Sequence, residues 1–172
     1  MRQVLRLWVA IALCTSCATL APPAVATPDA LARIEASADM AGAPIGHAPA
    51  RATIVVVFAS WCPHCHEQLG LLATLRGAHP GMRIIGINYK GHEEYNHQGG
   101  SDAVRDYVAD HAPWLRVVPC DEACFDSLGR PPVIPTTFVY DASGALVEHY
   151  DRRERPEPKR HELDELLRRL GA

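Results

Sequence analysis

The stretch that decides the fold is residues 53–65, which read TIVVVFASWCPHC. The first seven of these residues form a continuous run of β-branched and apolar side chains. Such a run is typical of a strand buried on both faces at the centre of a parallel sheet. Cys62 and Cys65 follow at once, and leucines spaced over residues 69–75 indicate that the cysteines open a helix. The segment therefore predicts a strand that leads into a helix, with a cysteine pair at the junction.

The C-x-x-C spacing at a helix N-terminus indicates redox chemistry. Free backbone N–H groups and the helix dipole favour the thiolate of Cys62 there. Pro63 suits the first helical turn, and protonated His64 adds positive charge next to the thiolate. Cys65 lies one turn further on, so we predict that Cys62 attacks and that Cys65 resolves the resulting bond. A permanent disulfide and half of a metal site are the alternatives, and a metal would need further ligands.

Outward from this junction, strand-like and helix-like segments alternate. Further strands are expected at residues 82–88, 115–118, 133–140 and 145–150, and helices at residues 31–40, 69–76, 102–112, 121–128 and 163–170. Strands that alternate with helices predict an α/β fold with a mixed, mostly parallel sheet flanked by helices. The turn between the last two strands predicts a hairpin that adds an antiparallel edge.

The start of the chain has the features of a secretory signal peptide over residues 1–26. Two arginines precede a short apolar run at residues 7–13, and residues 24–26 form an A-x-A cleavage site. Lipidation at Cys14 or Cys17, or an uncleaved anchor, is the alternative. We expect an exported protein, in the periplasm or outside the cell, where disulfides form and persist.

The remaining chain is expected to contain a lead-in segment at residues 27–50 and one domain at residues 51–172. The whole chain has 172 residues, 48% of them hydrophobic and 22% charged, which is an ordinary globular composition. The formal net charge is −3, which gives no electrostatic case for nucleic-acid binding. We expect a monomer.

A second motif accompanies the cysteine pair. Trp61, Cys62 and Cys65 follow a hydrophobic strand, and the sequence IPTTF stands at residues 134–138, about 70 residues later. This combination resembles the thioredoxin superfamily, over roughly residues 50–170. The resemblance implies that Pro135 is cis and packs against the dithiol, and that Ile134, Pro135 and Thr136 line the substrate groove. It implies protein thiols and disulfides as substrates, and no organic cofactor, because the dithiol itself carries two electrons.

A subgroup is also indicated. Residues 85–90, IGINYK, are similar to a segment of the exported reductases of cytochrome c maturation, the TlpA, ResA and CcmG (DsbE) type. In that group an extra strand and helix are inserted before the cis-proline, and residues 89–130 would correspond to them. The resemblance implies a reductase of cytochrome c maturation or envelope redox homeostasis, served by a membrane or periplasmic electron-transfer partner.

The sequence departs from these relatives at several positions. Gln68 and Gly70 stand where the subgroup has Glu and Pro, and Val56 stands where thioredoxin has a buried Asp. The usual proton acceptor for Cys65 is therefore missing, and His66 is either its substitute or an exposed polar residue.

The active-site dipeptide is another departure. Pro63 and His64 match the strongly oxidising enzyme DsbA instead of the usual reductases, so a thiol oxidase or isomerase is an alternative. A metal (copper) chaperone and a binding module on a vestigial scaffold are further alternatives. Trp61 is expected to form an exposed apolar lip that partner proteins touch.

Cys120 and Cys124 lie outside the pattern of these relatives. A local structural disulfide, two buried thiols and a metal site are all compatible with their spacing, although an i,i+4 pair in a regular helix is poorly placed for bonding. A fourth hypothesis is that Cys120 shares the sheet rim with Cys62, so that the two dithiols exchange electrons.

Two polar segments are expected to be solvated. Residues 90–100 contain His92, His97 and two glutamates in a Gly-containing stretch whose spacing matches no metal site. Arg152, Arg153 and Arg155 alternate with acidic residues.

Overall fold

The computed structural model describes residues 25–153 and 155–172. Cys14, Cys17 and residues 1–24 of the expected signal peptide lie outside the described residues. None of the helices in the described part of the chain is long and apolar enough to span a bilayer.

The described residues form one five-stranded sheet with the strand order β3-β2-β1-β4-β5. The strands are β1 (Ala52–Val57), β2 (Met82–Tyr89), β3 (Arg116–Cys120), β4 (Thr136–Asp141) and β5 (Leu146–Tyr150). β1, β2 and β3 run parallel, whereas β4 and β5 pair antiparallel as a hairpin at the edge. The mixed sheet that the sequence predicts is therefore confirmed, although two of its four strand pairings, β1 with β4 and β4 with β5, are antiparallel.

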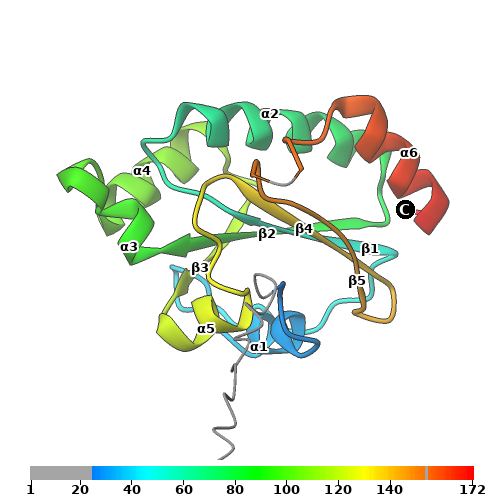
Figure 1. Cartoon of the computed structure of the whole chain (residues 1–172), viewed down its shortest axis with the longest axis horizontal. Coiled ribbons are helices and arrows are strands. Elements are labelled where there is room, and N and C mark those ends of the chain that lie inside the picture. The colour runs from blue at the N-terminus through cyan, green and yellow to red at the C-terminus, as the bar shows by residue number, and fades with distance from the viewer. Residues whose placement is uncertain (1–24, 154) are drawn as a thin grey trace, which may run out of the picture.

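Helices cover both faces of this sheet (Figure 1). They are α1 (Ala30–Glu35), α2 (Pro63–Ala78), α3 (Lys90–Glu93), α4 (Ser101–His111), α5 (Glu122–Ser127) and α6 (Arg160–Leu170), with a 3₁₀ turn, η1 (Tyr95–His97). α2, α4 and α6 lie on one face, and α1 and α5 lie on the other (Figure 1).

The central strand β1 explains this two-sided architecture. All six of its residues are buried. Ile54 and Val56 point into the core beneath α2 and α6, while Val55 and Val57 point into the core beneath α1 and α5. Since side chains alternate along a strand, a continuous apolar run supplies both faces and needs a helical layer on each.

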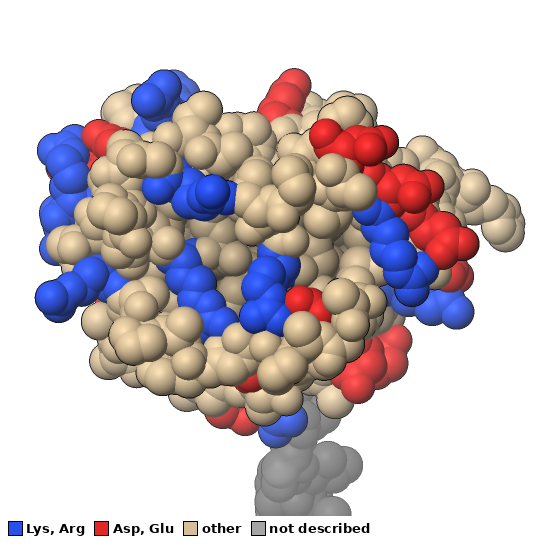
Figure 2. Space-filling view, turned by 180° about the vertical axis from the view of Figure 1, so that it is seen from behind, with Lys and Arg blue, Asp and Glu red and all other residues tan. Residues whose placement is uncertain are grey.

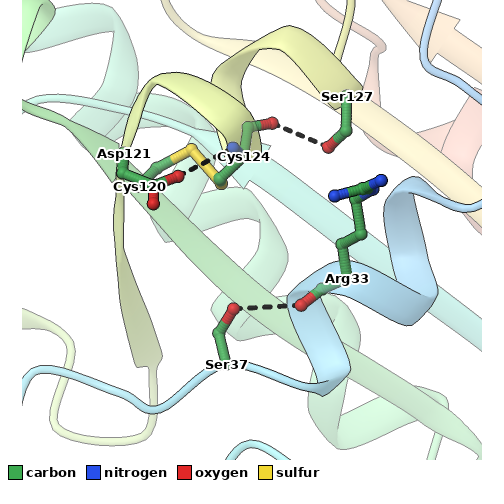
Figure 3. Close-up of a disulfide and its surroundings, with 6 residues drawn as sticks. All are labelled: Arg33, Ser37, Cys120, Asp121, Cys124 and Ser127. Atoms are coloured by element: carbon green, nitrogen blue, oxygen red, sulfur yellow. Dashed lines mark hydrogen bonds between the residues drawn. A yellow bond between two sulfur atoms is a disulfide. The ribbon is translucent and has the colours of Figure 1, made fainter.

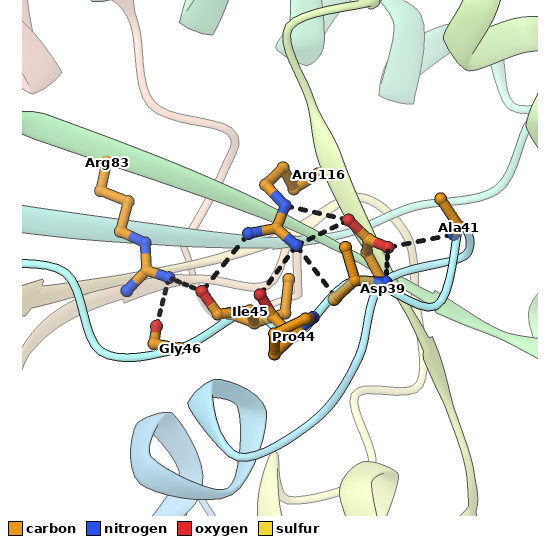
Figure 4. Close-up of polar contacts among 8 residues, drawn as sticks. Asp39, Ala41, Pro44, Ile45, Gly46, Arg83 and Arg116 are labelled. Carbon is orange, nitrogen blue, oxygen red and sulfur yellow. Dashed lines mark hydrogen bonds and ion pairs between the residues drawn. The ribbon is translucent and has the colours of Figure 1, made fainter.

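The segment expected to be a lead-in packs closely onto the sheet. Ion pairs and hydrogen bonds from two arginines of β2 and β3 hold it there (Figure 4). The guanidinium of Arg116 binds the Asp39 carboxylate at 2.7 and 2.9 Å, and Arg83 donates to the carbonyl oxygens of Ile45 and Gly46. Residues 30–46 thus complete the second core instead of preceding the fold.

Among the boundaries that differ from the sequence-based expectations, two have a clear physical reason. α1 ends at Glu35, earlier than expected, because the chain turns back there and Ala38 pairs with Pro44 in an isolated β-bridge. β4 begins at Thr136 instead of residue 133, because the preceding Pro135 has no N–H to donate to a ladder.

The polar stretch at residues 90–100 is more ordered than expected, since it contains α3 and η1.

On the back of the molecule, Lys and Arg side chains gather around a hollow, and acidic side chains lie mainly toward one edge (Figure 2).

Candidate active site

Cys62 and Cys65 lie where β1 passes into α2. Cys62 is the N-cap of α2, and its sulfur accepts a hydrogen bond from the backbone N–H of Cys65 at 3.3 Å. Pro63 occupies the first helical position, where a missing N–H costs nothing. Both cysteines are free thiols, with Cys62 4% exposed and Cys65 fully buried. The described geometry is therefore a reduced dithiol at a helix N-terminus.

The two thiols have opposite acidities. Hydrogen bonds from the side chain and backbone N–H of Cys65 outweigh burial and lower the pKa of Cys62 to about 7, and the charges of His64 and Arg152 act in the same direction. Burial, followed by the hydrogen bond to Cys62, raises the pKa of Cys65 far above its ordinary value. At neutral pH, Cys62 is thus available as a thiolate while Cys65 stays protonated.

The loop that contains Pro135 lies beside this junction. Thr136 begins β4 and pairs with Val57, the last residue of β1, so the residues that precede Thr136 lie next to the start of α2. The peptide bond between Ile134 and Pro135 is cis. Ile134 is half-buried, whereas Pro135 and Thr136 are buried. The Thr136 hydroxyl donates to the carbonyl oxygen of Val133, so it braces the loop internally.

Trp61 is not the exposed lip expected from the sequence. It is half-buried, and its indole N–H donates to the carbonyl oxygens of His92 and Glu93 at 3.1 and 2.9 Å. Its ring stacks on Tyr95 with 6.4 Å between ring centroids, and Tyr95 is the exposed member of the pair. The α3–η1 segment therefore supports Trp61, the residue that precedes Cys62.

Glu93 corrects the expectation of a solvated loop. Its side chain is buried, at 1% exposure, beneath the turn that leads to Trp61. The carboxylate accepts hydrogen bonds from the Ser60 N–H and the Asn88 amide, each at 2.8 Å, and from the Ser60 hydroxyl. Because three donors converge on it, this buried side chain positions Ser60, the residue just before the Trp-Cys motif. Its sequence position, among polar residues after a strand, gave no signal of this role.

The polar residues of α2 are distributed around the dithiol. His64 is exposed and pairs with Glu67 at 3.5 Å. His66 lies 2.6 Å from the carbonyl oxygen of Ser60 and stacks on Tyr107. Gln68 is buried, with its amide donating to the Thr137 hydroxyl at 3.4 Å. Among the described residues, no hydrogen bond joins any of these side chains to Cys65.

Cys120 and Cys124 form a disulfide (Figure 3). Cys120 ends β3 and Cys124 lies in the first turn of α5, so the pair does not share one regular helix and its Cα atoms are 5.4 Å apart. Asp121 caps α5 by accepting from the Cys124 N–H at 2.8 Å.

This disulfide belongs to the core beneath α1 and α5, whereas Cys62 and Cys65 belong to the core beneath α2. The two pairs thus point toward opposite faces of the sheet, and electron exchange between them stays a prediction.

No group of three or more His, Cys, Asp or Glu side chains in the described ranges is arranged to hold a metal ion.

Comparison with solved structures identifies the architecture. A secreted disulfide oxidoreductase of Mycobacterium tuberculosis, homologous to E. coli DsbE, is 17% identical, with a TM-score of 0.62 over 80% of this chain and 98% of that chain. A thioredoxin-like protein from Aeropyrum pernix is 18% identical, with a TM-score of 0.62 over 81% and 92%. A thiol:disulfide interchange protein from Chlorobium tepidum is 21% identical, with a TM-score of 0.58 over 79% and 92%.

The sequence itself matches no protein-family model and no curated protein. The structural likeness defines the class: the chain has a thioredoxin-like fold, as the sequence predicts.

Proposed function

We propose that this protein is an exported thiol-disulfide oxidoreductase that acts on protein substrates through Cys62 and Cys65. The observation that carries the proposal is the Cys62 sulfur at the N-terminus of α2, with its pKa lowered to about 7, beside the loop of cis-Pro135. A partly ionised thiol next to a resolving thiol is the arrangement that disulfide exchange requires.

The reaction proceeds in two exchanges. The Cys62 thiolate attacks one sulfur of a substrate disulfide, which forms a mixed disulfide and releases the other substrate sulfur as a thiolate. The Cys65 thiolate then attacks the Cys62 sulfur, closes the Cys62–Cys65 disulfide and releases the second substrate thiolate. Two electrons pass from the dithiol to the substrate, and a dithiol partner in the membrane or periplasm restores them.

We infer that the protein works as a reductase. A pKa of about 7 for Cys62 is close to the value in thioredoxin and far above the value of about 3.5 in DsbA. Pro63 and His64 match DsbA, but His64 is exposed and pairs with Glu67, and its charge contributes less to the acidity of Cys62 than the hydrogen bonds from Cys65.

One of the structural neighbours supports an extracytoplasmic role, because the DsbE homologue of Mycobacterium tuberculosis is a secreted protein. We propose cleavage before Thr27 and a role in cytochrome c maturation or envelope redox homeostasis.

The reduction potential tests the proposal. The exported protein carrying Cys120→Ala and Cys124→Ala would be equilibrated in glutathione or thioredoxin redox buffers, with tryptophan fluorescence as the signal. A reduction potential of about −270 mV for the Cys62–Cys65 pair supports a reductase, whereas a value of about −120 mV would indicate an oxidase.

An insulin-reduction assay is the second test of the proposed function. Insulin reduction by the wild-type protein that is lost in Cys62→Ser supports the proposal, and a wild-type protein that does not reduce insulin would overturn it. Stoichiometric copper binding by the reduced protein, without reductase activity, would support the metal-chaperone alternative.

A further inference from the structure

The loop between β5 and α6 carries an ion pair that contacts the residue before cis-Pro135. Arg152 donates from Nη1 to the carbonyl oxygen of Ile134 at 3.3 Å, and its Nε lies 3.0 Å from Oε1 of Glu157. Arg152 is 34% exposed and Glu157 is 27% exposed, so this pair is not the solvated face expected from the sequence. The guanidinium links the residue before cis-Pro135 to the carboxylate.

The backbone of this loop is also constrained. Arg152 has a φ of 61°, in the left-handed region that side chains other than glycine rarely occupy. A non-glycine residue keeps this conformation only where its surroundings hold it. The contacts to Ile134 and Glu157 are such a constraint, and they hold this loop against the residue before cis-Pro135.

Glu157 directs a polar atom inward without completing its hydrogen bonding. Its Oε1 is buried, and the Arg152 Nε at 3.0 Å is its ion-pair partner without the geometry of a hydrogen bond. A buried carboxylate oxygen whose hydrogen bonding is incomplete is costly, so it calls for a functional explanation. Among the causes that raise the pKa of Cys65, after its burial and the hydrogen bond to Cys62, is the negative charge of Glu157.

The chemistry of Cys65 requires a group of this kind. A buried thiol must lose its proton before it can attack the mixed disulfide, and bulk water does not reach it. Val56, at the position of the buried acid in thioredoxin, cannot accept a proton.

The other candidate groups are unsuitable or already occupied. The ionisable groups whose charges act on the two thiols, or are acted on by them, are His64 from α2, Tyr107 from α4, and Arg152 and Glu157 from the loop. Burial raises the pKa of Tyr107, so its phenol stays protonated, and a guanidinium cannot accept a proton. Glu93 is engaged by Ser60 and Asn88.

We propose that Glu157, held in place by Arg152, is the proton acceptor for Cys65 when the mixed disulfide is resolved. The inference rests on the proposed thiol-disulfide exchange. The Cys65 proton passes to the Glu157 carboxylate, directly or through one water. The Cys65–Cys62 bond then forms as the bond from Cys62 to the substrate breaks, and the substrate leaves as a thiolate that takes up a proton. In the reverse direction the same carboxylic acid returns the proton to Cys65.

The test is Glu157→Gln, which keeps the size of the side chain and removes its basicity. Rapid mixing of the reduced protein with a protein disulfide, followed by acid quenching, measures the lifetime of the mixed disulfide at pH 7. We expect that lifetime to increase about 100-fold, in line with general base catalysis. The rate of Cys62 alkylation reports the reactivity that the first exchange needs, and it should stay within about twofold of the wild-type rate.

Three further variants make the result specific. Arg153→Gln changes a neighbouring arginine that takes no part in the Arg152–Glu157 ion pair and serves as the matched control. Glu157→Asp keeps a carboxylate and should recover part of the rate. Arg152→Lys keeps the charge but loses the fork that joins Ile134 to Glu157, so it should lengthen the lifetime less than Glu157→Gln does.

Equal lifetimes in Glu157→Gln and Arg153→Gln, with both variants folded, would overturn the inference. So would equal slowing of Cys62 alkylation and of resolution in Glu157→Gln, because that pattern indicates a general distortion of the site. Absence of any mixed disulfide in the wild-type protein and in Cys65→Ser would instead overturn the proposed function.

Discussion

The acidity of Cys62 depends mainly on its resolving partner. Its sulfur accepts hydrogen bonds from the Cys65 side chain and from the Cys65 N–H, whereas His64 and Arg152 add only their charges. The C-x-x-C spacing is what brings that N–H to the N-cap sulfur. The variable dipeptide between the cysteines therefore adjusts a thiol that the spacing has already made acidic.

Alkylation of the reduced protein should titrate accordingly. We expect the rate of Cys62 alkylation by iodoacetamide to follow one ionisation with a midpoint near pH 7, since Cys65 stays protonated through this range. The rate should therefore fall as the pH decreases below 7. His64→Gln should move the midpoint upward by about 0.5 unit or less, because exposed charges interact weakly. A wild-type midpoint at the ordinary thiol value of about 8.5 would contradict this account.

Single residues of the site differed in how well the sequence revealed them. Cys62 and Cys65 could be identified because their roles depend on local spacing at a strand–helix junction. Glu93, Arg152 and Glu157 could not, because each reaches the site from a distant segment through side-chain contacts. In the sequence they look like the charged residues of any exposed loop.

At the scale of the elements, the Cys120–Cys124 disulfide joins the end of β3 to the start of α5. α5 is only six residues long, so its own hydrogen bonds stabilise it little. Phe125 of α5 stacks on Tyr89 of β2 with 3.8 Å between ring centroids, and the edge of the His92 ring contacts both. The disulfide thus holds an aromatic cluster that contacts the α3 segment beneath Trp61.

Removal of this disulfide should cost stability more than activity. For a bridge that spans a sequence separation of 4, loop-closure entropy predicts a loss of about 2 kcal/mol in the free energy of unfolding. Urea denaturation of Cys120→Ala, Cys124→Ala, compared with the oxidised wild type, measures it. Insulin reduction should be largely retained, and its abolition in a folded double variant would assign the disulfide a direct part in the reaction.

The sequence predicted elements well where apolar side chains follow a simple period. The buried runs gave the strands, and the leucines of residues 163–170 gave α6. α3 and η1 were missed because they are short and polar, and because contacts with Trp61 and Ser60 stabilise them more than any helical pattern does. The early end of α1 depends on a bridge between Ala38 and Pro44, which no local periodicity encodes.

At the scale of the whole molecule, the sheet has two cores of different origin. The core beneath α2, α4 and α6 comes from residues that follow β1 in the chain, together with β1 itself. The other core depends on α1 and Ile45, which precede β1. The thioredoxin-like fold in this chain therefore includes the segment that the sequence suggested as a lead-in.

Shortening one buried side chain of that segment tests how much the segment contributes to stability. Ile34 is almost completely buried against the sheet, so Ile34→Ala should lower the free energy of unfolding by about 2–4 kcal/mol through lost burial and a cavity. His47→Ala, at an exposed position of the same segment, should change it by less than about 0.5 kcal/mol. Equal, small effects in thermal or urea denaturation would show that residues 30–46 are dispensable for folding.

The attachment of this segment also determines the order in which the molecule can be completed. Asp39 pairs with Arg116, which lies 77 positions later in the chain. The N–H of Thr27 donates to the carbonyl oxygen of Ser127, which lies 100 positions after Thr27. A chain that is made or exported N-terminus first therefore carries the Thr27 N–H and the Asp39 carboxylate without these partners until residues 127 and 116 have appeared. During synthesis or export, these first residues are the ones that an unfolded-chain-binding chaperone meets for longest.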